Sequence, residues 1–436
     1  MCRFFVPLAL ALAGLASANA LAQQGSWGSA PAIPAAAPSQ GSPATSSVLT
    51  LQAAIQMALE SNPELSAARR EVEAAEGARI QAGVFQNPTL SVEMEDQQRD
   101  TRTTTVLFSQ PLELGGKREA RMAAADRGLD VARTQLEARQ VDVRANLTAT
   151  FFATLIAQDR VRLAQASLDL ARGGSQAAGK RVTAGKISPV EETKAKVAEA
   201  NVRLELIQAQ GELQTNLAQL RAAIGPGAPI TAVDGNTLAI PQAAPEGAME
   251  ALLADSPSMR QSRLEIQRLG ALADLERSKR IPDITLSAGG KRDNEQGRNL
   301  AVVGISVPLP LFDTNRGNVI EASRRRDKAE DEARSLELRL RAEMGAARQR
   351  YLSATNEVTA LQKEILPGAQ EAFDAATKGF ELGKFGYLDV LDAQRTLLQA
   401  RAQYLRSLAD AHRSVTDLDR LLGVNASAVA SPASNR

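Results

Sequence analysis

The sequence predicts a mainly α-helical protein with a small β part, built from two copies of one structural unit. Three observations predict this fold. Ala, Leu, Glu, Arg and Gln crowd the middle of the chain while aromatic residues make up only 3% of it, which is typical of long helices packed through small side chains. Apolar residues recur with a helical period, and several short motifs occur twice. Length alone, 436 residues, would instead suggest two or three ordinary globular domains.

Composition also limits the function. The 51 Lys and Arg residues balance the 50 Asp and Glu residues, so net charge indicates neither nucleic-acid binding nor a polybasic membrane anchor. Cys2 is the only cysteine and His412 the only histidine, which excludes a disulfide framework, a Cys/His zinc site and most Cys–His or Ser–His catalysis. We therefore expect no enzyme, no cofactor, no tight metal site and no nucleic-acid partner.

The amino terminus predicts export. Arg3 precedes an apolar stretch at 4–15, and small residues after it offer a cleavage site, so residues 1–22 are interpreted as a signal peptide. A membrane helix is the alternative, but the stretch is short for a span and no stop-transfer charges follow it at once. Residues 23–47 are expected to form a flexible Pro/Ala/Ser arm, and residues 425–436 a C-terminal tail.

Paired motifs indicate an internal duplication. Two pairs share one offset and two more share a slightly larger one: Pro63 with Pro257, Pro88 with Pro282, Gly185-Lys186 with Gly383-Lys384, and Ile224-Gly225 with Leu422-Gly423. We assign the first structural repeat to 48–225, an equatorial linker to 226–247 and the second repeat to 248–424, because self-similarity at long period indicates repeated supersecondary units. A duplicated soluble domain is the alternative.

Each repeat should contain one very long helix. In the second repeat, steps of three and four residues define one helical stripe and exclude a strand. The stripe consists of Ala329, Ala333, Leu336, Leu340, Met344, Ala347, Tyr351, Ala354, Val358, Leu361 and Ile365. Pro111 and Pro310 precede the two helices, and no proline interrupts either helix until Pro367, so each helix should run about 60 to 70 residues, on the order of 100 Å. Pro367 and Gly368 would kink the second.

Four shorter helices, each about half as long, are expected at 49–85, 190–224, 248–279 and 388–422. Two of them laid end to end match one long helix. The Pro- and Gly-rich junction between the repeats should then be a loop outside the helical layer, at mid-height.

Strict alternation of apolar and polar residues predicts two strand hairpins, at 88–110 and 282–308. The strands are expected at 89–95, 103–109, 283–287 and 299–307, with polar turns at 96–102 and 290–298. One face of each strand must therefore meet something apolar. The returning strands carry Thr104, Val106 and Phe108 on one face, and Val303, Ile305 and Val307 on another.

Four strands cannot close a barrel, and isolated hairpins on helix ends would expose their edges. Several chains must therefore share the sheet. Because only helices or a closed barrel satisfy the backbone in a bilayer, an exported chain with alternating strands predicts an oligomeric barrel that continues into a helical tube. A soluble coiled coil with appended hairpins is the alternative.

The run Phe108-Ser109-Gln110-Pro111-Leu112-Glu113-Leu114-Gly115-Gly116-Lys117-Arg118, the duplicated turn motifs and the signal peptide resemble TolC-like outer-membrane factors, in particular the cobalt–zinc–cadmium (CzcC-like) branch. The resemblance covers about 48–424. It implies a homotrimer with four strands per protomer in a shared 12-stranded barrel in outer-membrane lipid, and long helical hairpins in a trimeric α-barrel tunnel in the periplasm.

The resemblance also implies a function and partners. The chain would be the passive exit duct of a tripartite efflux system for heavy-metal cations of the Co/Zn/Cd/Ni type, with a periplasmic adaptor and an inner-membrane resistance–nodulation–division (RND) transporter. A multidrug or type I secretion channel is the alternative within this architecture. A periplasmic coiled-coil adaptor or scaffold is the alternative of another class, but we find no lipoyl-like β segments.

By resemblance, two helix turns lie at the periplasmic tip and dock the adaptor. These are Gly185-Lys186 and Gly383-Lys384. Glycine can take a positive φ, which reverses a long helix tightly, so helix termination alone would also explain both glycines. Arg181 and Tyr387 are possible gate links, named by their neighbourhood to the turns.

Asp389 and Asp392 follow the second turn. They are three residues apart, so they share a helix face, and threefold symmetry would convert each into a ring of carboxylates. By resemblance they narrow the periplasmic entrance and select cations, which carboxylate rings favour electrostatically. Negative charge at a helix amino terminus would alone explain one of them. The first repeat has Glu191 and Lys194 at these positions, so the rings should come from the second repeat only.

Overall fold

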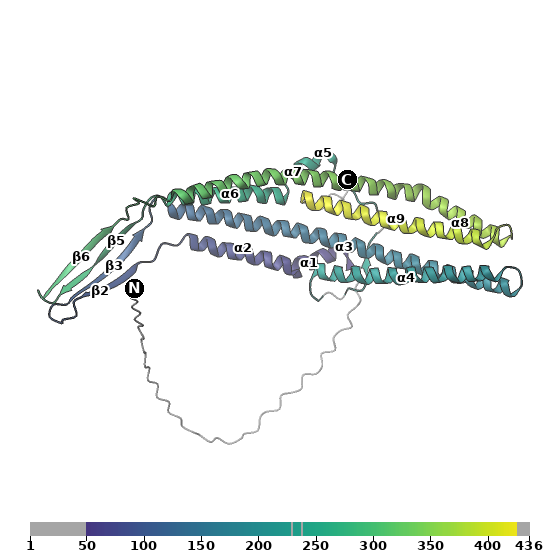
Figure 1. The fold of residues 1–436 in the computed structure, drawn as a ribbon, viewed down its shortest axis with the longest axis horizontal. Coiled ribbons are helices and arrows are strands. Elements are labelled where there is room, and N and C mark those ends of the chain that lie inside the picture. The colour runs from purple at the N-terminus through teal and green to yellow at the C-terminus, as the bar shows by residue number, and fades with distance from the viewer. Residues whose placement is uncertain (1–48, 228–229, 237–238, 425–436) are drawn as a thin grey trace, which may run out of the picture. The chain divides into compact units, whose positions relative to one another are not determined.

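The computed structural model describes residues 49–227, 230–236 and 239–424; the expected signal peptide, arm and C-terminal tail lie outside them. The chain divides into two units, 1–44 and 45–436, and every described element belongs to the second. Figure 1 shows these elements in order: β1 Leu49–Thr50, α1 Leu51–Ser61, α2 Pro63–Ala82, β2 Thr89–Glu95, β3 Thr103–Leu112, α3 Lys117–Thr183, α4 Pro189–Ile224, β4 Val233–Asp234, α5 Glu246–Ala254, α6 Pro257–Ser278, β5 Ile284–Asp293, β6 Arg298–Ser306, α7 Arg316–Ala360, η1 Leu361–Ile365, α8 Leu366–Glu381 and α9 Tyr387–Leu422.

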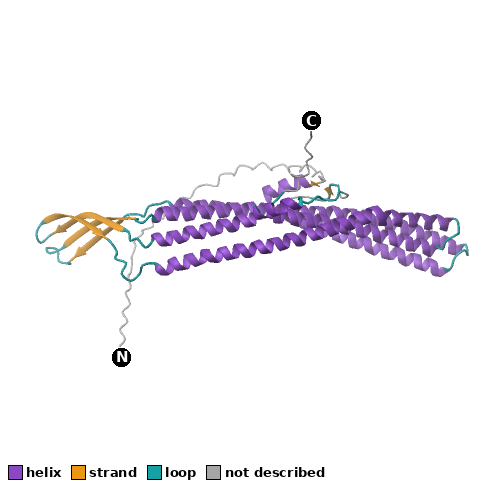
Figure 2. Ribbon diagram, turned by 90° about the horizontal axis from the view of Figure 1, so that it is seen from above, coloured by secondary structure: helices purple, strands orange, loops and turns teal. Residues whose placement is uncertain are grey.

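The second unit has a sheet at one end and helix turns at the other (Figure 1, Figure 2). Next to the sheet, α2, α3, α6 and α7 pack side by side in that order. Toward the turns, α3 packs on α4 and α9, and α9 packs on α7 and α8. The predicted mainly helical fold is confirmed, and α3 is one helix of 67 residues. Among the described residues, no helix is long and apolar enough to cross a membrane.

The four longer strands form one antiparallel sheet in the order β2-β3-β5-β6. The β3–β5 ladder joins the two repeats, and the Ser109 and Ser287 hydroxyls lie 2.8 Å apart across it. Two predicted strand ends were wrong because this ladder extends them. It pairs Leu112 with Ile284 and Thr103 with Asp293, so β3 passes Pro111 and the second turn shortens to 294–297.

The prediction of single helices at 49–85 and 248–279 was also wrong. Each is two helices, because Pro63 and Pro257 stand at the first position of α2 and α6. A proline there lacks the N–H that would continue the preceding helix. Asn62 caps α2 by accepting from the Glu64 and Leu65 N–H groups, at 2.8 and 3.4 Å, and Ser256 caps α6.

The two breaks explain why the proline and Ile/Leu-Gly motifs occur together in both repeats. Asn62 Nδ2 donates to the Ala223 carbonyl at 2.9 Å, so the first break contacts the end of α4. Gly225, with φ +123°, comes directly after α4 and lies so close to the end of α1 that a Cβ there would be 2.8 Å from the Ser61 carbonyl oxygen. A Cβ on Gly423, after α9, would likewise lie 2.4 Å from Pro257 Cδ. Within each repeat, therefore, the proline at the helix break and the glycine after the last helix belong to one contact between helix ends.

The sequence predicted that the linker would be a loop, but the structure shows that part of it is a strand and part a helix. Val233–Asp234 pairs in parallel with Leu49–Thr50, and α5 begins within the linker at Glu246. Gln158 of α3 holds this strand through both amide atoms, since Nε2 donates to the Val233 carbonyl and Oε1 accepts from its N–H, each at 2.9 Å. Two residues are too few for a sequence pattern to indicate a strand.

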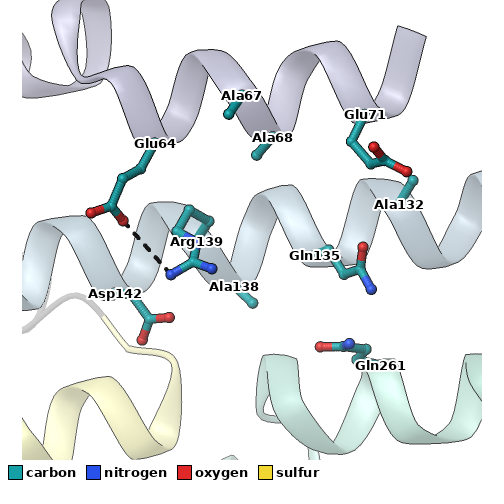
Figure 3. A pocket seen from close by; sticks show the side chains of 10 residues that line it. All are labelled: Glu64, Ala67, Ala68, Glu71, Ala132, Gln135, Ala138, Arg139, Asp142 and Gln261. Carbon is teal, nitrogen blue, oxygen red and sulfur yellow. Dashed lines mark ion pairs between the residues drawn. The ribbon is translucent and has the colours of Figure 1, made fainter. Parts of the chain in front are cut away.

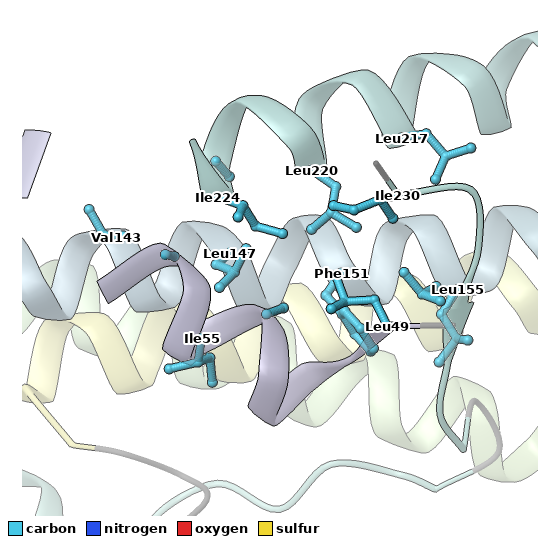
Figure 4. Packing of buried hydrophobic residues seen from close by; sticks show 14 of the residues in the cluster. Leu49, Ile55, Val143, Leu147, Phe151, Leu155, Leu217, Leu220, Ile224 and Ile230 are labelled. Atoms are coloured by element: carbon cyan, nitrogen blue, oxygen red, sulfur yellow. The ribbon is translucent and has the colours of Figure 1, made fainter. Parts of the chain in front are cut away.

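One hydrophobic cluster fastens the linker to the helices (Figure 4). It joins side chains from α1, α3, α4 and the linker around Phe151, which is 1% exposed. This cluster is the principal core at mid-height.

The second long helix contains a π turn at Leu361–Ile365. The turn lies directly before Pro367, whose ring would clash with the carbonyl of residue 363 in an unbroken α-helix. The expected disturbance at Pro367 therefore takes the form of a π turn, while α3, without proline, continues uninterrupted.

Candidate functional site

The four-stranded sheet has one apolar and one polar face. Cross-strand pairing places eight exposed apolar side chains on a common face: Leu90, Val92, Met94, Val106, Phe108, Leu286, Val303 and Ile305. The opposite face carries Thr89, Ser91, Glu93, Glu95, Thr103, Thr105, Ser109, Thr285, Ser287, Lys291, Asp293, Arg298 and Ser306, with Leu107, Leu300 and Val302 as apolar exceptions. Such alternation is typical of strands between lipid and a polar lumen.

The register changes one expectation about these faces. Val303 and Ile305 lie on the same sheet face as Val106 and Phe108, because β5 pairs with both β3 and β6 and so relates their residues. Val307 lies just beyond the end of β6. Sequence periodicity could assign faces within a strand but not between strands, since that requires the register.

The segment 108–118 forms the junction between the sheet and α3. Lys117 Nζ lies 2.7 Å from Asp283 Oδ1, which also accepts from the Leu114 N–H at 3.0 Å, so the junction ties the first repeat to the second. Arg121 donates to both carboxylate oxygens of Glu113, at 2.6 and 3.1 Å. This hydrogen bond lowers the pKa of Glu113. Sequence reasoning missed Asp283 because its partner is more than 160 residues away.

A polar groove of about 710 Å³ runs between α2, α3 and α6 (Figure 3). Its residues are Glu64, Ala67, Ala68, Glu71, Ala132, Gln135, Ala138, Arg139, Asp142 and Gln261. The small alanines leave the space, and Glu64 pairs with Arg139 at 3.7 Å. At about 100° per residue, Gln135 and Asp142 point to the opposite side of α3 from Phe151 and Leu155, which face the linker. The groove therefore lies on the face of the helical layer away from the linker.

Both helix turns have the same backbone motif. Gly185 and Gly383 have φ of +68° and +74°, so the predicted positive φ is confirmed. The Lys186 N–H donates to the Arg181 carbonyl at 2.9 Å, and the Lys384 N–H to the Gly379 carbonyl at 2.8 Å. These six-to-one bonds define Schellman turns, which satisfy the last carbonyls of a helix. Lys186 and Lys384 are exposed.

The two turns are joined by an apolar and cationic contact. Ala178, Ala195, Ile187, Phe380 and Leu391 pack together, and the Arg181 guanidinium lies 3.9 Å from the centre of the Phe380 ring. Arg181 thus links α3 to α8 by a cation–π interaction. The side chain of Tyr387 lies outside the described residues. Sequence reasoning did not name Phe380, because an aromatic residue on an apolar helix face gives no indication of its cationic partner.

Asp389 and Asp392 both lie in the first turns of α9 and are exposed. Asp389 Oδ2 accepts from the Gly386 N–H at 2.9 Å, so this carboxylate caps the helix amino terminus. The structural role foreseen for one aspartate is therefore filled by Asp389. Asp392 lies one turn further along the helix.

Comparison with known proteins identifies the family. The model of the family described as "Outer membrane efflux protein" matches residues 54–226 and 248–424. The chain belongs to the outer membrane efflux protein family. These two matched segments correspond to the two repeats on either side of the linker. The chain is accordingly an outer-membrane efflux channel component, and its apolar sheet face is the part suited to contact lipid.

Two relatives are resistance proteins of Cupriavidus metallidurans. The chain is 45% identical over 427 residues to the cobalt-zinc-cadmium resistance protein CzcC, covering 97% of this chain and 100% of CzcC. It is 31% identical over 305 residues to the nickel and cobalt resistance protein CnrC, covering 69% and 72% of the two chains. The resemblance to the cobalt–zinc–cadmium branch is thus confirmed.

A solved structure shares the fold. The outer membrane protein VceC from Vibrio cholerae superposes with a TM-score of 0.73 at 20% identity, covering 86% of this chain and 96% of VceC. At this identity the likeness concerns the fold alone.

Proposed function

We propose that this family member is the exit duct for heavy-metal cations in a tripartite efflux system that includes an adaptor and an RND transporter. The observation that carries the proposal is the identity to CzcC along the whole of that protein, whose name specifies cobalt, zinc and cadmium. The more distant CnrC, named for nickel and cobalt, supports the same class of substrate.

The duct is proposed to be a homotrimer. The sheet has four strands, with β2 and β6 at its open edges. Four strands are too few to enclose a lumen, and exposed edges in lipid would leave backbone groups unpaired. Three copies that pair β6 of one with β2 of the next would give a closed barrel of twelve strands.

A lumen of this kind suits the passage of hydrated cations. The groove between α2, α3 and α6 contributes Glu64, Glu71 and Asp142 against one cation, Arg139. The described residues contain no group of three or more His, Cys, Asp or Glu side chains able to hold a metal ion. Weak electrostatic attraction along the wall therefore accounts for transit better than tight binding does.

The periplasmic tip is proposed to dock the adaptor. Its support is the repeated turn geometry, which presents Gly185-Lys186 and Gly383-Lys384 at the end of the helices opposite the sheet. Arg181 is proposed as a gate link, acting through its contact with Phe380 between the two helical hairpins. Tyr387 stays a proposal from sequence.

Asp389 and Asp392 are proposed to form two carboxylate rings at the entrance. His412 lies on the face of α9 that the linker covers, since it hydrogen-bonds to the backbone of Ala239. Asp389 and Asp392 lie on a different, exposed face of α9. Capping by Asp389 is compatible with this role, because the cap hydrogen bond engages only one carboxylate oxygen, Oδ2.

Loss of metal tolerance is the expected result of deleting the gene from its host. Growth with graded Co²⁺, Zn²⁺ and Cd²⁺ would measure it, since cations that leave the pump need this duct. Restoration by a plasmid copy is the control. Sensitivity to drugs with unchanged metal tolerance would contradict the proposal and favour a multidrug channel.

The double variant Asp389→Asn with Asp392→Asn should conduct with reduced preference for cations. A unit charge about 4 Å from a passing ion attracts a cation and repels an anion by about 1 kcal/mol each in water, so we expect roughly a thirtyfold fall in the cation-to-anion permeability ratio. Reversal potentials in planar bilayers under a salt gradient measure this ratio. Glu191→Gln, at the corresponding position of the first repeat, is the matched control. An unchanged ratio in the double variant would refute the rings.

A further inference from the structure

An exposed apolar segment follows the last strand of the sheet. After β6 the chain runs through Val307, Pro308, Leu309, Pro310, Leu311 and Phe312 without a charged residue, until Asp313. Leu309 and Leu311 are 75% and 74% exposed, and Phe312 is 98% exposed. Within the part of the chain that the structure describes, these large side chains are therefore uncovered.

The segment continues the apolar stripe of β6. Val303 and Ile305 belong to the apolar face of the sheet, and alternation carries Val307 and Leu309 onto the same side. The Leu311 N–H then donates to the Leu309 carbonyl at 2.8 Å, so the chain bends at Pro310 and places Leu311 and Phe312 at the end of the stripe.

Two features argue against a neighbouring strand as the cover for this segment. Pro308 and Pro310 have no N–H, so the segment cannot continue a hydrogen-bonded ladder with a second copy. Side chains on the apolar face of a barrel wall also point outward instead of toward the next strand.

The equivalent junction of the first repeat contains polar side chains that hold it in place. There Gln110 Nε2 donates to the Gln86 carbonyl at 3.0 Å, and Glu113 pairs with Arg121. In the second junction Leu309 and Leu311 stand at the positions of Leu112 and Leu114, which are only 42% and 38% exposed. Val307, Pro310 and Phe312 stand at the positions of Gln110, Glu113 and Gly115, so the second junction lacks the polar groups of the first. Connecting strand to helix therefore does not require the more apolar and more exposed sequence of the second junction.

The height of the apolar band along the sheet explains the difference. On β2 the apolar band extends to Met94. The residues opposite Met94 across the sheet are polar, namely Thr104, Arg292 and Asn299, so the apolar band on β5 and β6 lies nearer the helices than it does on β2. Barrel strands tilt by roughly 35–45° in the membrane, so a flat bilayer crosses successive strands at shifting ladder positions. On β6 that shift brings the segment 307–312 to the level of the bilayer.

We propose that the segment 307–312 is a lipid contact site that inserts into the periplasm-facing leaflet of the outer membrane, among phospholipid acyl chains and their glycerol groups. It completes the lower edge of the apolar band where β6 has ended, and Phe312 occupies the interfacial level at which aromatic side chains are favoured. The inference rests on the outer-membrane location of the family and not on the proposed metal substrate.

Tryptophan quenching in lipid vesicles tests the site. Trp27 is the only tryptophan, so Trp27→Phe provides a silent background for Leu309→Trp and Phe312→Trp. The full-length protein is reconstituted into phosphatidylcholine vesicles with or without bromine on the acyl chains. Val303→Trp, on the apolar sheet face, is the lipid standard, and Leu382→Trp, at the exposed helix turn, is the water standard.

We expect brominated lipid to quench both segment variants as strongly as it quenches Val303→Trp. We also expect their emission maxima to lie at shorter wavelengths than the maximum of Leu382→Trp. Emission and quenching like those of Leu382→Trp would overturn the site. Blue-shifted emission without quenching would also overturn it, since protein from a second copy would then cover the segment. Only variants with wild-type bilayer conductance are compared, and Leu311→Trp replaces either variant that does not assemble.

Discussion

Phe151→Ala is expected to destabilise the protein by about 3–5 kcal/mol, the largest effect of any single substitution predicted for this chain. Phe151 is 1% exposed at the centre of the cluster that joins α1, α3, α4 and the linker (Figure 4). Its ring also meets Phe152 edge to face, with the ring centres 5.8 Å apart. Truncation would leave a cavity where helices and linker meet. Urea-induced unfolding followed by circular dichroism measures the loss.

Phe151→Leu is the matched control for this substitution. Leucine keeps most of the apolar volume, so we expect a cost below about 1.5 kcal/mol. Limited proteolysis of the linker adds a local measure, because Leu49 and Val233 pack in the same cluster. Equal stability of the alanine variant and the wild type would show that the cluster does not hold the linker to the helices.

Local sequence signals predicted the parts of the fold that depend on local backbone chemistry. Gly185 and Gly383 end helices because glycine takes positive φ without strain, and this holds wherever the helices pack. The π turn before Pro367 and the helix breaks at Pro63 and Pro257 also follow from proline chemistry. The sequence marked each of these prolines, but the helix boundaries drawn at 49–85 and 248–279 ignored two of them.

Contacts between distant segments could not be predicted in the same way. The β3–β5 ladder, the Lys117–Asp283 ion pair and the Arg181–Phe380 contact each join the first repeat to the second. Side-chain period assigns a face within one element, whereas these contacts depend on register and on helix order. For the candidate site, the sequence indicated the turns and the two aspartates, but it did not indicate the groove between α2, α3 and α6 or which aspartate caps the helix.

His412 is the clearest case of a residue whose environment was not visible in the sequence. The helical pattern around it does not indicate its neighbours, yet it is 5% exposed and stacks on Phe152 with the ring centres 3.9 Å apart. Burial lowers the pKa of its imidazole from 6.5 to about 4. Within the described part of the chain, no group hydrogen-bonds to its Nε2, so a proton added there would be buried without an acceptor.

His412→Phe should therefore remove a loss of stability in acid. Below pH 6.5 the unfolded chain binds a proton at His412 that the folded chain resists, so the contribution of His412 to stability falls as the pH drops from about 6.5 to about 4 and then levels off. The loss amounts to about 3 kcal/mol, at about 1.4 kcal/mol for each pKa unit. Phenylalanine keeps the stacked ring but cannot titrate. Thermal unfolding of both proteins between pH 8 and pH 4 measures the difference.

Asp419 provides the opposing control for this measurement. Burial raises the pKa of its carboxyl from 3.8 to about 7, so its contribution runs the other way. The unfolded chain ionises this group at a lower pH than the folded chain does, and stability therefore falls as the pH rises from about 4 to about 7. The two slopes oppose each other in the wild type. The Asp419→Asn protein should become less stable as the pH falls from 7 to 4, whereas the His412→Phe protein should become more stable over the same change. Parallel pH profiles for the two variants would show that neither group titrates as its burial implies.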